Sequence, residues 1–118
     1  MKKFLIVLLS FFLITTVFTS NVVKAEDGYP DITGFQLDEN GVMTWDPVEH
    51  AVRYSIFYGD DIHTVGSGAY EPSFEVFDSF KSDGLKSGTY QITVEAKDAN
   101  DHILARSKSP SFEYVNDN

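Results

Sequence analysis

The stretch Trp45–Tyr58, W-D-P-V-E-H-A-V-R-Y-S-I-F-Y, decides how this chain folds. It ends one predicted strand on a large aromatic residue, passes through a loop and begins a second strand. Pro47 in the loop has no backbone N–H, which argues against one continuous strand. In the second strand Tyr54, Ile56 and Tyr58 share one face, as expected of a half-buried strand. Two apolar-faced strands joined by a loop predict a β-sheet core.

The first 25 residues differ from all that follows. Lys2 and Lys3 precede an apolar run of 15 residues, Phe4–Phe18, and Ala25 is a small residue at a suitable cleavage point. This layout predicts a secretory signal peptide, and its composition is typical of bacterial export. A membrane anchor is the rival interpretation, but it needs about 20 apolar residues. We therefore divide the chain into a signal peptide at 1–25, a lead-in at 26–31, one domain at 32–115 and a tail at 116–118.

The charge balance of the exported part excludes several partners. Removing 25 of 118 residues leaves 93. These carry all 18 acidic residues and only six of the nine basic ones, so their formal charge is −12. Such a chain repels phosphate backbones and anionic lipid, so we expect neither nucleic-acid binding nor membrane insertion. There is no cysteine. A secreted domain of this kind must fold by packing alone, and we expect a free extracellular monomer.

Downstream of Trp45–Tyr58, alternation continues most cleanly in Gly88–Lys97. Ser73–Phe80 is apolar enough for another strand, Ile62–Val65 for a short edge strand, and no segment after the leader has helical periodicity. Pro110 predicts a bend in the last strand. About seven short strands separated by turn signals predict an all-β antiparallel sandwich. The remaining predicted strands are 32–37, 41–45 and 103–115.

Three motifs follow one another along the chain: Trp45–Val48 with Ala51, Tyr54 and Ile56, then Leu85–Ala96, then Ser107–Phe112. Together they resemble a fibronectin type III domain of the immunoglobulin-like sandwich superfamily. The resemblance covers roughly 30–115. It implies a seven-stranded sandwich used as a spacer, adhesion or recognition module, without catalytic activity. Leu85 and Tyr90 lie one residue closer in sequence than is usual in that family. The sequence therefore does not decide whether the Tyr90 hydroxyl makes the family's hydrogen bond to the upstream backbone.

The sequence offers little for catalysis. Nucleophilic chemistry needs a serine, threonine or cysteine beside an oriented base, and no serine lies in a nucleophile-elbow pattern. No glycine-rich phosphate loop precedes a helix. We expect a protein that is not an enzyme and that needs no cofactor; a small metal-dependent enzyme is the weakest alternative.

In this topology the loops 46–50 and 98–102 emerge at the same end of the sandwich. Their oxygen and imidazole groups would suit Ca²⁺, or a transition ion if the histidines converge. The plainer interpretation is solvated turn residues, which we favour because no dense D-x-D-x-D-G ligand loop is present. The candidate binding residues here are Asp46, Glu49, His50, Asp98, Asn100, Asp101 and His102, of which Asp46, His50, Asp98, Asp101 and His102 are the metal candidates.

Phe57 should point outward from its sheet and could anchor a protein or a sugar. The alternative is an aromatic covered by the irregular segment Gly66–Tyr70, in which we expect Gly66-Ser67-Gly68 to be a flexible loop. We also expect Arg53 and Glu95 to pair across neighbouring strands.

These observations predict a secreted interaction or adhesion module that binds an extracellular protein or carbohydrate through its loop ends or a sheet face. The alternative is a secreted inhibitor or immunity-type factor that uses the loops 46–50 and 98–102.

Overall fold

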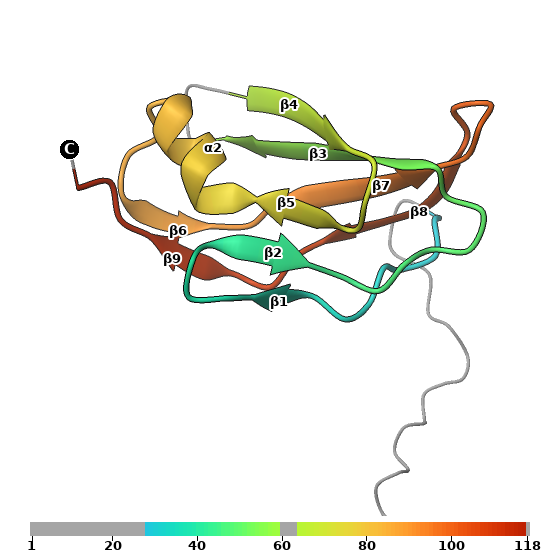
Figure 1. The fold of residues 1–118 in the computed structure, drawn as a ribbon, viewed down its shortest axis with the longest axis horizontal. Coiled ribbons are helices and arrows are strands. Elements are labelled where there is room, and N and C mark those ends of the chain that lie inside the picture. Colours follow the sequence, from blue (N-terminus) through green and yellow to red (C-terminus); the bar gives the residue numbers. More distant parts are fainter. Residues whose placement is uncertain (1–27, 60–63, 118) are drawn as a thin grey trace, which may run out of the picture.

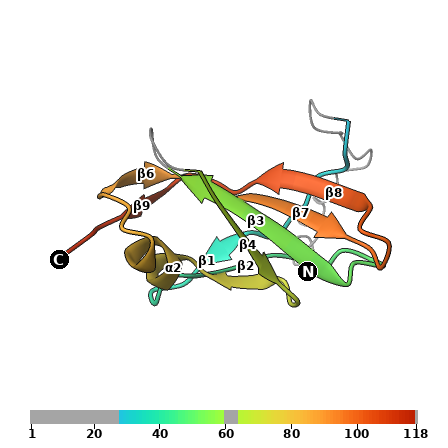
Figure 2. The same ribbon diagram turned by 90° about the horizontal axis from the view of Figure 1, so that it is seen from above.

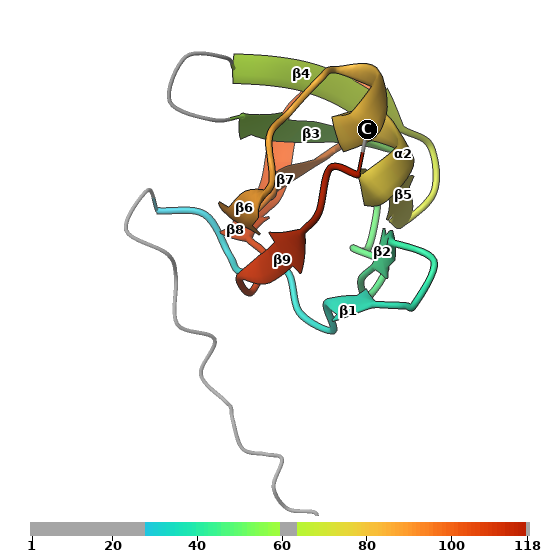
Figure 3. The ribbon, with the colours of Figure 1, turned by 90° about the vertical axis from the view of Figure 1, so that its left-hand side faces the viewer.

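The computed structural model describes residues 28–59 and 64–117, so the predicted leader lies outside the described residues. The described part forms nine strands and one short helix, α2, in two layers (Figures 1 and 3). Every strand pairing is antiparallel. The predicted all-β architecture of packed antiparallel sheets is therefore confirmed.

One layer is a three-stranded sheet in the order β1-β2-β5, and the other is a four-stranded sheet in the order β4-β3-β7-β8. The pair β6-β9 forms a third, two-stranded sheet. The bounds are β1 Gln36–Leu37, β2 Val42–Thr44, β3 Arg53–Gly59, β4 Thr64–Ala69, β5 Ser73–Glu75, α2 Val76–Ser82, β6 Gly88–Tyr90, β7 Thr93–Lys97, β8 Ile103–Lys108 and β9 Phe112–Tyr114.

The core lies between the layers and is largely aromatic. The period-2 pattern of β3 buries Tyr54, Ile56 and Tyr58, as predicted, and leaves the residues between them half-buried. At one end of the core Tyr54 meets Trp45 edge-on, with ring centroids 5.4 Å apart. At the other end Phe80 contacts four aromatic rings and is fully buried. Edge-to-face pairs of this kind add about 0.5–1.5 kcal/mol beyond the area they bury.

Two predicted long strands are each divided in two, and Ser109 lies at the break. The stretch 88–97 becomes β6 and β7, and 103–115 becomes β8 and β9, with Pro110 at the predicted bend. Ser109 is 1% exposed. Its N–H donates to Ile92 O at 2.8 Å, and its hydroxyl oxygen accepts from Ile92 N–H at 3.1 Å. The side chain thus supplies a bond at the break in the ladder between the β6–β9 and β7–β8 pairings.

The prediction of a strand over Ser73–Phe80 is wrong beyond Glu75, where α2 begins. Val76 and Phe80 are buried on one face of this helix, and Phe77 is half-buried. Val76 N–H and Phe77 N–H both donate to Gly41 O, at 2.9 and 3.2 Å. Because the apolar spacing of one, three and four residues is helical rather than alternating, the expectation that no helical segment follows the leader is also wrong.

Gly41 shows why α2 fits where it does. Its φ of 83° is a conformation that L side chains rarely adopt, and a Cβ there would lie 2.2 Å from the Phe77 ring. The Asn40-Gly41 turn between β1 and β2 thus leaves room for the helix.

The edge strand predicted at 62–65 overlaps β4 at residues 64 and 65. Residues 60–63 lie outside the described ranges, and β4 runs from Thr64 through the Gly66-Ser67-Gly68 segment, which we expected to be irregular. β4 pairs with β3 over its whole length. Its glycines were mistaken for a loop because they lack side chains, although a strand edge tolerates them.

Tyr90 keeps the backbone bond that the short Leu85–Tyr90 spacing left open. Its hydroxyl donates to Lys86 O at 2.5 Å, four residues upstream. The ring is buried and meets Phe80 edge-on. The bond ties the chain between α2 and β6 to the core.

Candidate functional site

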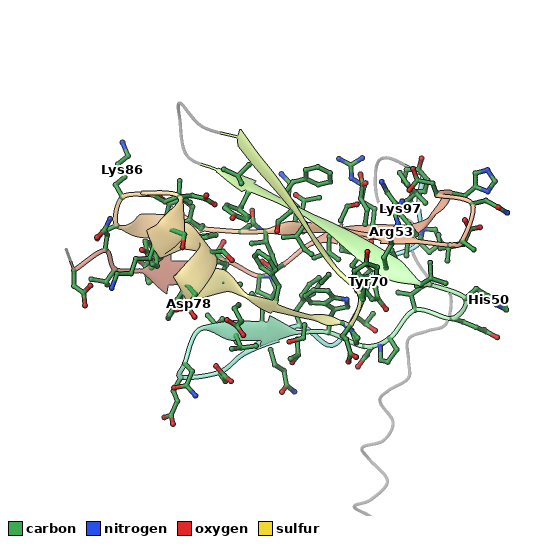
Figure 4. The ribbon with its side chains drawn as sticks, turned by 45° about the horizontal axis from the view of Figure 1, so that its top comes forward. His50, Arg53, Tyr70, Asp78, Lys86 and Lys97 are labelled. Atoms are coloured by element: carbon green, nitrogen blue, oxygen red, sulfur yellow. The ribbon has the colours of Figure 1, made fainter. Side chains whose placement is uncertain are left out.

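The loops 46–50 and 98–102 lie at the same end of the molecule, as predicted (Figure 1). Figure 4 shows His50, Arg53 and Lys97 at this end and Asp78 and Lys86 at the other. Val52 N–H donates to Lys97 O at 2.8 Å and joins the chain after the first loop to the strand before the second. We call this region the loop end.

The first loop is a defined turn. Ala51 N–H donates to Val48 O at 3.0 Å, and His50 has a φ of 73°. A positive φ at the third residue alone is the geometry of a type II turn, a position that favours glycine. Both central side chains, Glu49 and His50, are exposed, and they lie 3.7 Å apart.

The second loop is organised by Asp98. Its carboxylate accepts from Asn100 N–H and His102 N–H, both at 2.9 Å. These bonds, with the His102 bond the largest cause, lower the pKa of Asp98 below its usual range. Asp101 has a φ of 71°, again a glycine-like conformation held by another residue type. Each loop therefore contains one strained non-glycine residue.

The predicted Arg53–Glu95 pair is wrong. The register places Arg53 opposite Lys97 and Glu95 opposite Ser55. Arg53 pairs with Asp101 across the loop end, and Lys97 Nζ lies 3.7 Å from the same carboxylate. Glu95, which is 7% exposed, lies 3.5 Å from Arg106 on β8. The β3–β7 register therefore keeps Arg53 and Glu95 apart, and the partner for Arg53 comes from the hairpin beyond β7.

A groove of about 450 Å³ opens at the loop end between the lead-in segment, the first loop and β8. Its apolar lining includes Pro47, Val48 and Leu104. Its lining carboxylates are Asp31, Asp46 and Glu49, with His50 beside them. The loop-end groove, defined by these residues, joins an apolar lining to negative charge.

Three hydrogen bonds hold the groove in shape. Thr33 Oγ1 donates to the Asp46 carboxylate at 2.8 Å, and Asp46 N–H donates to Thr33 O at 2.8 Å. Gly34, with a φ of 80°, leaves space for this carboxylate, since a Cβ there would lie 2.3 Å from it. On the other wall, Val48 N–H donates to the Tyr54 hydroxyl oxygen at 3.1 Å.

The structure divides the candidate site residues between two places. Asp46, Glu49 and His50 line the groove, whereas Asp98, Asp101 and His102 belong to the neighbouring hairpin and bond within it or to Arg53 and Lys97. Among the described residues no group of three or more His, Asp or Glu side chains is placed to hold a metal ion.

Phe57 lies opposite Gly66 on β4 and is half-buried. Its ring carbons come within 3.6 Å of the point where a Cβ of Gly66 would stand. The ring therefore lies against the glycine of the edge strand.

Sequence reasoning missed Asp31 and Leu104 as groove residues. Asp31 falls in the lead-in, which has no periodic pattern, and Leu104 lies at a half-buried position of β8. Arg106 N–H donates to Pro30 O at 2.9 Å, so the lead-in is fixed along β8. Nothing in the local pattern indicates this pairing.

No protein-family model, no curated protein and no solved structure matches the chain. Within the described ranges, no helix has the length and apolar character needed to span a bilayer.

Proposed function

We propose that this chain is a secreted, non-catalytic binding module of fibronectin type III type, which takes an extracellular protein partner at the loop-end groove. The observation that carries the proposal is the groove itself, which joins an apolar lining to three carboxylates. A partner surface that offers an aliphatic side chain beside a lysine or arginine would complement it. The strand orders β1-β2-β5 and β4-β3-β7-β8 support the sandwich type.

The lining of the groove favours a protein over a carbohydrate. None of its lining residues is Phe, Tyr or Trp, and sugar rings bind best on the exposed faces of these side chains. The aromatic candidate for a sugar, Phe57, is half-buried against the edge strand. Acidic groups around an apolar floor instead suit a basic protein surface, where charge complementarity speeds association.

The proposal is tested with isotope-labelled protein and a blocked Leu-Lys-Leu peptide. When the peptide is added, we expect the NMR signals of the Asp31, Glu49 and Leu104 backbone amides to change their chemical shift. These changes should become smaller as salt is added, because the charges are exposed. Leu-Glu-Leu and Ser-Lys-Ser peptides are the controls, and each should bind more weakly. Shifts of the same size with all three peptides would contradict the proposal.

Glu49→Gln should weaken Leu-Lys-Leu binding about two- to fivefold, the effect of one exposed charge pair. Glu39→Gln is the matched control, because Glu39 is also exposed but lies in the β1–β2 turn at the opposite end. Equal effects of the two substitutions would place the binding outside the groove.

The second candidate is an inhibitor that binds an enzyme through both loops of the loop end, 46–50 and 98–102. What favours it is that each loop holds one non-glycine residue, His50 or Asp101, at a positive φ. Backbone strain of this kind collects at functional sites. In the inhibitor the hairpin 98–102 must contact the partner, so Asn100→Ala should reduce binding; in the binding module it should not.

A further inference from the structure

The outer edge of β4 is an open strand edge. β4 lies at the end of the four-stranded sheet and pairs with β3 alone among the described strands. The other end of the same sheet is covered, since the lead-in segment bonds to β8 through Arg106 N–H to Pro30 O and Ile32 N–H to Ser107 Oγ. The contrast between the two ends sets β4 apart.

The register shows which backbone groups face outward. Ser109 N–H donates to Ile92 O, so the backbone groups of Val94 point toward β8 and those of Thr93 point toward β3. Continued across β3, the same alternation points the backbone N–H and C=O groups of Ile56 toward β4. The N–H and C=O groups of Gly66 and Gly68 therefore face the open edge.

Among the described residues, the β4 edge has none of the usual devices that block strand addition. Those devices are proline, charged side chains, bulges and covering segments. The strand reads T-V-G-S-G-A, with no proline or charge, and its pairing with β3 has no register shift. Gly66 and Gly68 present no side chain on the outer face, so another backbone can approach closely.

A pocket opens beside this edge, between β4 and α2. Its volume is about 300 Å³, and Val65, Gly66 and Ser67 form its β4 side. Its charged lining residues are Asp78 and Asp83, both acidic. The Tyr58 hydroxyl donates to Asp83 at 2.5 Å and holds that carboxylate in the pocket lining. Figure 2, which looks down on the molecule, shows β4 lying over β3, with α2 to one side of it.

We propose that β4 accepts an extended segment of a partner protein as an added strand, with a lysine or arginine of that segment entering the pocket beside α2. Strand addition gives affinity through main-chain hydrogen bonds, and a side-chain pocket gives specificity. Charge complementarity selects the occupant: the pocket carries two carboxylates, and the chain as a whole has a formal charge of −9. A second copy of the same chain would bring like charges together. This site lies away from the loop-end groove and does not depend on the proposed function.

The test uses a soluble peptide in which Thr and Val alternate around one central Arg. Bound to isotope-labelled protein, it should slow hydrogen exchange at the Gly66 and Gly68 amides about tenfold or more. Replacing the Arg by Glu, or methylating alternate peptide nitrogens, should abolish the protection. Protection that survives either change, or shifts confined to the loop-end groove, would overturn the proposal.

Two pairs of protein variants separate the edge from the pocket. Gly66→Pro removes an outward N–H, whereas Gly66→Ala keeps it, and a Cβ at Gly66 meets its nearest atom at an ordinary 3.6 Å. Gly66→Pro alone should abolish binding. Asp78→Asn should weaken it about threefold or more, whereas Glu39→Gln should not. If Gly66→Pro does not fold, the methylated peptide decides the same question. A concentrated peptide-free sample that protects the same amides would show self-pairing and overturn the choice of partner.

Discussion

The Tyr54 hydroxyl oxygen accepts a hydrogen bond of 3.1 Å from the Val48 backbone N–H. The Tyr54 ring is buried against Trp45 in the core, while Val48 lines the loop-end groove. One side chain thus couples the packing of the two layers to the shape of the groove.

Tyr54→Phe removes the acceptor and keeps the ring. We expect the free energy of unfolding to fall by about 0.5–1.5 kcal/mol, the net worth of one hydrogen bond. Urea denaturation measures the loss, and hydrogen exchange at Val48 should become faster. Tyr70→Phe is the control, since Tyr70 is 84% exposed. An unchanged exchange rate at Val48 would show that the bond does not hold the loop.

Ser109→Ala should be among the costlier serine substitutions in the chain. It leaves the Ile92 N–H, at a fully buried position, without the side-chain oxygen that now accepts its proton. An unpaired buried donor costs about 1–3 kcal/mol. Thermal or urea unfolding should show this loss, while Ser111→Ala at an exposed position changes little. Equal stability of the two variants would mean that another acceptor serves Ile92.

His50→Gly should stabilise the protein. A φ of 73° costs a residue with a Cβ about 1–2 kcal/mol, and part of the gain is offset by the greater freedom of glycine in the unfolded chain. We expect a net gain of about 0.5–1 kcal/mol. Glu49→Gly, one residue earlier and without a positive φ, should destabilise instead. A loss with His50→Gly would show that the imidazole makes a stabilising contact.

The stability should depend on the ionisation of Asp98. Its folded-state pKa is lowered by the His102 and Asn100 backbone bonds, so the ionised carboxylate stabilises the folded state. This contribution is fully present above the unfolded value of 3.8 and is lost as the pH falls through the lower folded value. The difference in unfolding free energy between the wild type and Asp98→Asn should therefore shrink between about pH 5 and pH 2. A difference that stays constant over this range would show that the ionised Asp98 carboxylate does not stabilise the folded state.

The sequence predicted the parts of the fold that depend on alternation and turn chemistry. Tyr54, Ile56 and Tyr58 are buried because they share one face of a strand, and Pro110 marks a bend because it cannot continue a ladder. The α2 helix was missed because three apolar residues in seven suit either element, and the choice depends on Gly41, which is distant in sequence. β4 was missed in part because Gly66 and Gly68 carry no side-chain pattern.

The candidate site was predicted in part for a similar reason. The two loops were placed at one end by topology alone, and Asp46, Glu49 and His50 do line the groove. Arg53 was given the wrong partner because pairing depends on the exact register and on the reach of the 98–102 hairpin. Asp31 was not considered, because the bond between Pro30 and β8 joins segments 76 residues apart.

The most direct test of the proposed binding function is the amide-shift map of the labelled protein with the Leu-Lys-Leu peptide. The proposal predicts shifts that centre on Asp31, Glu49 and Leu104, diminish with salt and weaken in Glu49→Gln but not in Glu39→Gln. Shifts that lie elsewhere on the described surface, or that the Leu-Glu-Leu peptide reproduces, would contradict it.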